Sequence, residues 1–146
     1  MALHRHMELV ENEVVTAALP MSGPYSLSGP MRNLLVEDSP YGFVAYLASS
    51  ALSFQAAYGN IFSNGKISDL FKPMYAELVE QYANEELDLF DLNQALIELL
   101  ISEVGSSIPH YMIYDSIYQQ VISDDNHPIN VALRDNDVYD LSLIHI

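Results

Sequence analysis

The chain has no cysteine and few basic residues, with five lysine and arginine residues against twenty aspartate and glutamate residues. The absence of cysteine excludes disulfides, thiolate metal sites and a cysteine nucleophile. A formal net charge of -15 repels phosphate backbones and anionic membrane surfaces, so nucleic-acid binding is not expected. The absence of cysteine does not identify the cellular compartment, because exported proteins can also lack cysteine.

Common catalytic and ligand-binding motifs are absent as well. The sequence contains no Gly-x-Ser-x-Gly, no Gly-x-Gly-x-x-Gly, no phosphate-binding loop and no His-Glu-x-x-His. These motifs mark a serine-hydrolase elbow, a dinucleotide site, a nucleotide triphosphate site and a zinc-binding helix, respectively. The first residues, MALHRHMELVENE, carry no apolar run, so we do not expect them to act as a secretory signal.

The composition that is present favours a folded domain with a substantial core. The chain has 146 residues, is 50% hydrophobic and has a mean hydropathy of +0.10, which argues against disorder. Residues 39–65 contain no charge, but serine, glutamine and asparagine interrupt the run and Gly42 and Gly59 bracket its apolar part. This pattern indicates a buried helix and not a membrane span.

Apolar residues recur at helical spacing through most of the chain. A Ser39-Pro40 pair is a plausible cap and first turn, Gly59 ends the same helix, and Asn64-Gly65 forms a turn. A shorter helical pattern lies within Met1 to Val10. We expect further helices over Met31 to Val36, Tyr41 to Tyr58, Lys72 to Tyr82, Asp91 to Ser102, Ile108 to Ile122 and Pro128 to Arg134.

One segment, Val14 to Leu19, is predicted to be a buried strand, because it is β-branched and apolar and Pro20 bars a helix. A strand that is apolar on both faces needs neighbours on both sides. No second convincing strand occurs before the last six residues, LSLIHI. The sequence therefore predicts a fragment of an α/β protein, mostly α-helical, with one buried strand and a helical insertion.

Two phrases carry a resemblance to a known family. AALPMSGPYSLSG lies near the start and NHPINVALRDNDVYD (Asn126 to Asp140) near the end, with ISDLFKPMYAEL (Ile67 to Leu78) between them. In order and spacing they resemble bacterial secreted α/β-hydrolases of the esterase and lipase-like kind, over roughly Met1 to Asp140. Ser26 departs from the family phrase, which has aspartate at this position.

The resemblance implies a division of the chain. Residues 1–30 would be part of the α/β-hydrolase core, residues 31–140 a helical cap or lid, and residues 141–146 a non-native tail. It also implies that the nucleophile elbow lies ahead of Met1 and that the acid and the histidine lie after Ile146. No catalytic residue and no cofactor are then expected in this chain, and the family implies a secreted or periplasmic location.

The resemblance also suggests which residues face the substrate. The loop after the strand would lie at its carboxyl end, where α/β folds bind ligands, and the cap would line the acyl pocket. The alternative for the cap aromatics is ordinary core packing. The predicted substrate-side residues are Met21, Ser22, Gly23, Tyr25, Phe43 and Tyr46.

Other candidates for chemistry are weaker. Ser22 lies between Pro20 and Pro24 with no helix directly behind it, so we expect turn hydrogen bonding and not a nucleophile. No metal site is expected, because the histidines are too scattered to converge and the aspartates after residue 134 lack the glycine and glutamate of a calcium loop. A helix end or turn capped by carboxylates is predicted instead. The residues concerned are His4, His6, His110, His127, Asp135, Asn136, Asp137 and Asp140.

The leading functional hypothesis is the cap-bearing middle of a serine α/β-hydrolase that acts on carboxylic esters or related acyl compounds. Such a piece would be inactive alone, because nucleophile, base and acid lie outside it. A rival hypothesis is a small acidic all-helical module that binds a basic protein partner. A membrane-embedded protein is a third, less favoured reading. The sequence predicts neither the preferred ester nor the oligomeric state.

Overall fold

The computed structural model describes residues 26–137. The predicted helix within Met1 to Val10, the predicted strand Val14 to Leu19 and the tail from residue 141 lie outside this range. Within it, six α-helices and two short 3-10 helices follow one another. They are α2 (Pro30–Val36), α3 (Ala45–Tyr58), η1 (Ile67–Asp69), α4 (Pro73–Ala83), α5 (Leu89–Val104), η2 (Pro109–Met112), α6 (Asp115–Ser123) and α7 (Pro128–Asp135).

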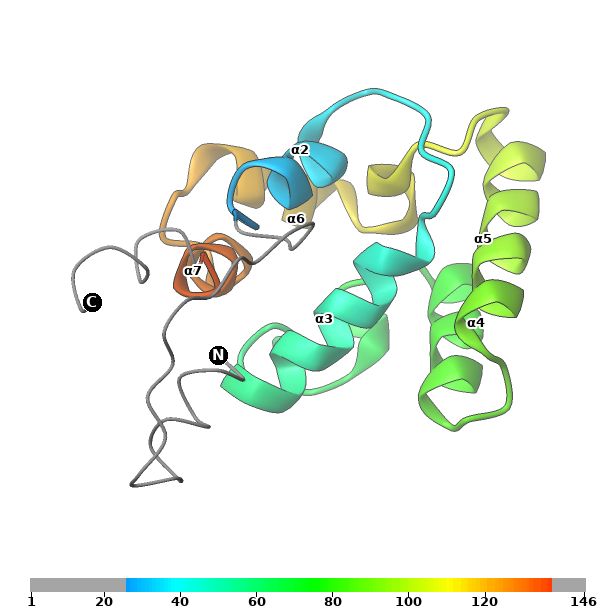
Figure 1. Ribbon diagram of the computed structural model, residues 1–146, viewed down its shortest axis with the longest axis horizontal. Coiled ribbons are helices and arrows are strands. Elements are labelled where there is room, and N and C mark those ends of the chain that lie inside the picture. The colour runs from blue at the N-terminus through cyan, green and yellow to red at the C-terminus, as the bar shows by residue number, and fades with distance from the viewer. Residues whose placement is uncertain (1–25, 138–146) are drawn as a thin grey trace, which may run out of the picture.

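Helix α3 lies in the middle of the assembly (Figure 1). The hairpin of α4 and α5 packs on one side of it, while α2, α6 and α7 gather on the other. The expectation of a mostly helical chain is confirmed for the described part. The only β pairing among residues 26–137 is an isolated antiparallel bridge between Phe71 and Ile113, so this part does not show an α/β fold.

Local signals set several helix ends, as predicted for Pro73, Pro128 and Gly59, whereas α2 begins at Pro30, one residue before the predicted start. Pro30, Pro73 and Pro128 each occupy the first turn of a helix, where the fixed φ of proline suits the helix and its missing N–H is not needed. Gly59 ends α3 in the left-handed region with φ 74°, and Gly65 forms the expected turn with φ 77°. Both conformations favour glycine because it has no Cβ.

The predicted start of the central helix was wrong. Helix α3 begins at Ala45 and not at Tyr41, and the Ser39-Pro40 pair caps no helix. Instead, the Tyr41 N–H donates to the carbonyl of Ser107 at 3.0 Å. The Asn93 side chain on α5 accepts from the Ala45 N–H at 3.2 Å and donates to the Gly42 carbonyl at 3.1 Å. These distant partners hold residues 41–44 outside the helix.

The predicted helix from Ile108 to Ile122 is also wrong, because it is two elements. The 3-10 helix η2 ends at Met112, and Ile113 is extended with φ -98° and ψ 164°. The backbone around Ile113 pairs with the chain ahead of α4: Lys72 N–H donates to Met112 O at 2.9 Å, and Tyr114 N–H donates to Leu70 O at 3.2 Å. This pairing forces a new helix, α6, to begin at Asp115.

A buried amide joins α2, α6 and α7, the helices on the side of α3 opposite the α4 and α5 hairpin. The side chain of Asn130 on α7 is 2% exposed and donates to the carbonyls of Val121 at 2.8 Å and Asp124 at 2.9 Å. Its oxygen accepts from Nε of Arg32 on α2 at 3.2 Å. Each hydrogen-bonding group of this amide is thus used, which makes its burial tolerable.

The carboxylate of Asp137 ties the two ends of the described chain together. It accepts hydrogen bonds from the N–H groups of Leu27 and Ser28, the second at 2.9 Å, and from the Ser28 hydroxyl. The sequence predicted that carboxylates of this segment cap neighbouring N–H groups; Asp137 instead accepts from residues about 110 positions away. Partial burial raises the pKa of Asp137, but the hydrogen bonds from Ser28 and Leu27 outweigh it and hold this pKa below 3.8.

Replacing Asp137 by alanine should therefore destabilise the domain. Two backbone N–H groups and one hydroxyl lose a charged acceptor, which we expect to lower the free energy of unfolding by about 1 to 2 kcal/mol. Urea unfolding followed by circular dichroism measures this change. Asp135→Ala is the control, because Asp135 is exposed on the same turn; equal losses for both variants would contradict the role of Asp137.

His127 forms a second cap, at the start of α7. Its Nδ1 accepts a hydrogen bond from the Ile129 N–H at 3.3 Å, an arrangement that requires the neutral ring. Burial lowers the pKa of His127 from its ordinary value of 6.5, although the nearby Asp124 carboxylate raises it in part. The folded state therefore binds a proton at the His127 ring less tightly than the unfolded chain does.

Stability should consequently fall as the pH drops below 6.5. With a lowered folded pKa, the contribution of His127 is complete above its unfolded pKa and is lost as the pH falls through the folded pKa. His127→Asn keeps a capping oxygen that does not titrate, so it should lose less stability than the natural protein between pH 7.5 and 5.5, by at most about 1 kcal/mol. Urea unfolding at pH 7.5 and at pH 5.5 measures this difference. Equal losses of stability in His127→Asn and in the natural protein would contradict the role of His127.

Candidate functional site

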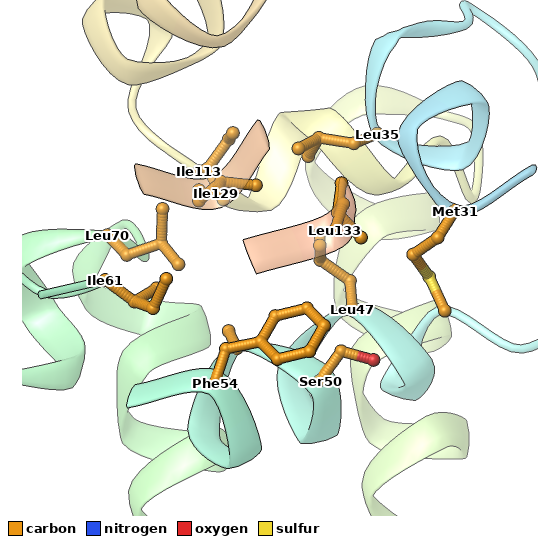
Figure 2. Close-up of a pocket in the computed structure, with 11 residues that line it drawn as sticks. Met31, Leu35, Leu47, Ser50, Phe54, Ile61, Leu70, Ile113, Ile129 and Leu133 are labelled. Carbon is orange, nitrogen blue, oxygen red and sulfur yellow. The ribbon is translucent and has the colours of Figure 1, made fainter. Parts of the chain in front are cut away.

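An apolar groove runs along α3 and is walled by α2 and α7. Figure 2 shows its side chains converging from these helices and from the segments before α4 and α6 onto one space. The lining residues are Met31, Leu35, Leu47, Ser50, Ala51, Phe54, Ile61, Leu70, Ile113, Ile129 and Leu133. The groove is therefore assembled from residues that lie up to about 100 positions apart in the sequence.

The contribution of α3 follows from helical geometry. Leu47, Ser50, Ala51 and Phe54 lie three or four residues apart and therefore share one face of the helix. Of these residues, only Ala51 is buried; the other three are half-exposed. This face is thus covered incompletely by α2 and α7, and the uncovered part forms the floor of the groove.

The groove is open and almost wholly apolar. Only about 20 Å³ of it holds a water-sized group, because the larger empty volume of about 400 Å³ includes open solvent. Seven of the eleven lining residues are buried, so the groove is a small hollow over the core. The Ser50 hydroxyl is the one polar side-chain group in its lining. An apolar lining with few polar groups suits the hydrocarbon part of a small ligand and offers little to a charged one.

A smaller hollow continues the groove towards the start of α3. It shares Met31 and Leu47 with the groove and adds Phe43 and Tyr46, among other residues. The rings of Phe43 and Tyr46 lie 4.5 Å apart between centroids, and Tyr46 is 44% exposed. These two predicted substrate-side residues are therefore together, at one end of the groove and open to solvent.

The other four predicted site residues, Met21, Ser22, Gly23 and Tyr25, lie outside the described residues. The groove also contains residues that sequence analysis did not single out, above all Met31 and Leu35 on α2 and Leu133 on α7. Their helical spacing was recognisable in the sequence. That these short helices meet over α3 was not, because it depends on contacts between distant segments.

A buried histidine, His110, directly follows Pro109, which lines the smaller hollow. The side chain of His110 is 10% exposed, and its Nε2 is 3.8 Å from an Asp38 carboxylate oxygen. Its ring stacks on Tyr118 at 4.4 Å between centroids, and its Nδ1 has no hydrogen-bond partner within the described part of the chain. This pairing was not predictable from the sequence, because Asp38 and His110 are 72 residues apart.

The polar groups present do not form a reactive centre in the part of the chain that the structure describes. Across residues 26–137, no three His, Asp or Glu side chains converge as metal ligands. The pair of His110 and Asp38 has no hydroxyl nucleophile bonded to it there. The arrangement along α3 offers an apolar surface with one hydroxyl.

The helices of this region are also short relative to a bilayer. Between residues 26 and 137, none has both the length and the apolar character required to cross a membrane. Helix α3, which lies within the uncharged stretch, has 14 residues.

Comparisons of the chain with protein-family models, with curated proteins and with solved structures find no match. The resemblance to α/β-hydrolases therefore stays a prediction that depends on the sequence phrases.

Proposed function

We propose that this chain is the cap-bearing part of a serine α/β-hydrolase that acts on carboxylic esters or related acyl compounds. The observation that carries the proposal is the apolar groove along α3. Caps of this fold cover the active site and contribute to the acyl pocket. The groove has an apolar lining, and its side chains would have to move apart to admit an acyl chain. Phe43 and Tyr46 at its end are the cap residues that the family resemblance points to.

A second observation supports the proposal. The Asp137 carboxylate of the second phrase accepts hydrogen bonds from Leu27 and Ser28 of the first phrase, which lie 110 and 109 residues away. Ser26 stands where the family phrase has aspartate, so a carboxylate reaches this loop from the other phrase instead. If both phrases belong to one structural unit of the family, their residues should contact each other, as Asp137 and Leu27 do.

In this proposal the chain contributes binding and not bond cleavage. Each methylene that moves from water into the groove contributes about 0.8 kcal/mol. Coverage of the ester by the apolar side chains of α2, α3 and α7 also excludes water, which strengthens the electrostatic interactions of a neighbouring catalytic centre. Nucleophile, base and acid would come from chain outside this segment, and the secreted or periplasmic location follows from the family alone.

Binding of uncharged esters tests the groove directly. Methyl butyrate and methyl hexanoate avoid repulsion by the acidic protein, and the affinity should rise about fourfold for each added methylene. Amide chemical shifts in NMR spectra should change for α3, α2 and α7. Ser50→Leu fills the groove and should weaken binding about tenfold, whereas Ser53→Leu on the exposed side of α3 should not. Equal affinities for both variants would exclude the groove as the site.

The purified chain should show no esterase activity of its own. With p-nitrophenyl butyrate, we expect turnover equal to that of buffer, because no catalytic triad is present in the proposed assignment. Ser22→Ala should leave this baseline unchanged. Turnover that Ser22→Ala abolishes would overturn the assignment of the nucleophile to chain outside this segment.

A further inference from the structure

Helix α5 has two apolar faces, and one of them is largely exposed, although Phe90 contacts Phe43 and Ile97 packs partly against the core. Leu92, Leu96 and Leu100 are fully buried against the neighbouring helices. A second row on the same helix faces solvent: Phe90 is 73% exposed, Ile101 54% and Val104 43%. We call this row, together with the half-exposed Ile97, the α5 surface. It comprises Phe90, Ile97, Ile101 and Val104.

The spacing of this row suits another helix. Phe90, Gln94, Ile97, Ile101 and Val104 follow one another at steps of four, three, four and three residues. Side chains with this average spacing of about 3.5 residues form a straight seam, into which the side chains of a second helix fit at a shallow crossing angle. The row spans 14 residue steps, which corresponds to about 21 Å or four helical turns.

An aromatic cluster extends the α5 surface at its first residue. The ring of Phe90 meets that of Phe43 edge-on, with 5.7 Å between centroids and 87° between the planes. Phe43 in turn contacts the exposed Tyr46. Aromatic side chains are frequent anchors in protein interfaces, and their faces attract arginine and lysine. This end of the surface is therefore equipped for a partner that carries cations.

The charge around the α5 surface has a single sign. From residue 73 to residue 133 the sequence holds eleven aspartates and glutamates and no lysine or arginine. Asp91, Glu98 and Glu103 lie on α5 itself, and Glu86 and Asp88 precede it; all are exposed. A helix with basic residues beside its apolar row would pair with these carboxylates.

The same charges disfavour two other occupants. In a second copy of the chain, the carboxylates of one α5 would face those of the other with no cation between them, which costs affinity. An anionic lipid surface is repelled for the same reason. The described features therefore favour a basic protein partner over a homodimer or a membrane.

We propose that the α5 surface binds an amphipathic helix of a partner protein, with an apolar row bordered by lysine and arginine. The helix lies along α5 with its apolar side chains between Phe90 and Val104. Its basic side chains reach Asp91, Glu98 and the aromatic cluster. The α5 surface shares no residue with the apolar groove along α3. The aromatic cluster borders the smaller hollow at the end of that groove, so the tests below use variants of α5 residues, which leave the groove unchanged.

A pair of designed peptides tests the proposal with the whole chain. Both have about 18 residues with leucine at heptad spacing; one has lysine at the remaining positions and the other glutamate. Fluorescence anisotropy should show binding of the lysine peptide and not of the glutamate peptide. Ile101→Ser should weaken binding about tenfold, whereas Ile122→Ser, which alters an exposed apolar residue of α6, should leave it unchanged.

A charge-matched pair separates docking at α5 from general attraction to an acidic protein. Glu98→Gln and Glu80→Gln remove the same charge from exposed positions on α5 and α4, and only the first should weaken binding, by about threefold. The proposal would be overturned if Ile101→Ser and Ile122→Ser had equal effects or if Glu98→Gln and Glu80→Gln had equal effects. It would also be overturned if the lysine peptide did not bind. Sedimentation of the chain alone should show a monomer; a dimer that Ile101→Ser dissociates would assign the surface to a second copy instead.

Discussion

The carboxylate of Asp137 sets the geometry on which the groove depends. By accepting hydrogen bonds from Leu27 and Ser28, it fixes the residues just before α2 to the segment that follows α7. The neighbouring Asn136 also donates to the hydroxyl of Tyr58 at the end of α3 at 2.8 Å. Two adjacent side chains thus hold α2, α7 and α3 in the arrangement that leaves an apolar strip of α3 uncovered.

Distant side chains satisfy polar backbone groups throughout this helical assembly. A helix end exposes N–H or carbonyl groups that need partners, and a sheet that could organise the helices is not present among residues 26–137. Asn93 caps α3 from α5, and Asn130 joins α7 to the end of α6 and to Arg32 of α2. The two asparagines therefore orient the helices that pack on either side of α3.

The two proposed binding surfaces differ in charge, so the salt dependence of binding distinguishes them. The groove along α3 is apolar and carries only the Ser50 hydroxyl, so salt should affect its affinity for an uncharged ester little. The α5 surface combines exposed apolar residues with carboxylates, so salt should weaken its attraction for a basic helix. Phe43 and Tyr46 lie where the two regions come closest, since they border the hollow and contact Phe90.

By itself, the sequence determined those helices whose ends carry a local signal. Pro73 and Pro128 have a fixed φ, and Gly59 adopts a conformation that other residues avoid, so α4, α7 and the end of α3 were predictable. The tertiary structure alone decided where α3 begins, and it broke the predicted helix at Ile113. It also brought α2, α3 and α7 together around the groove. The physical reason is that these outcomes depend on hydrogen bonds and packing between distant residues, such as Asn93 and Ala45, which leave no periodic pattern in the sequence.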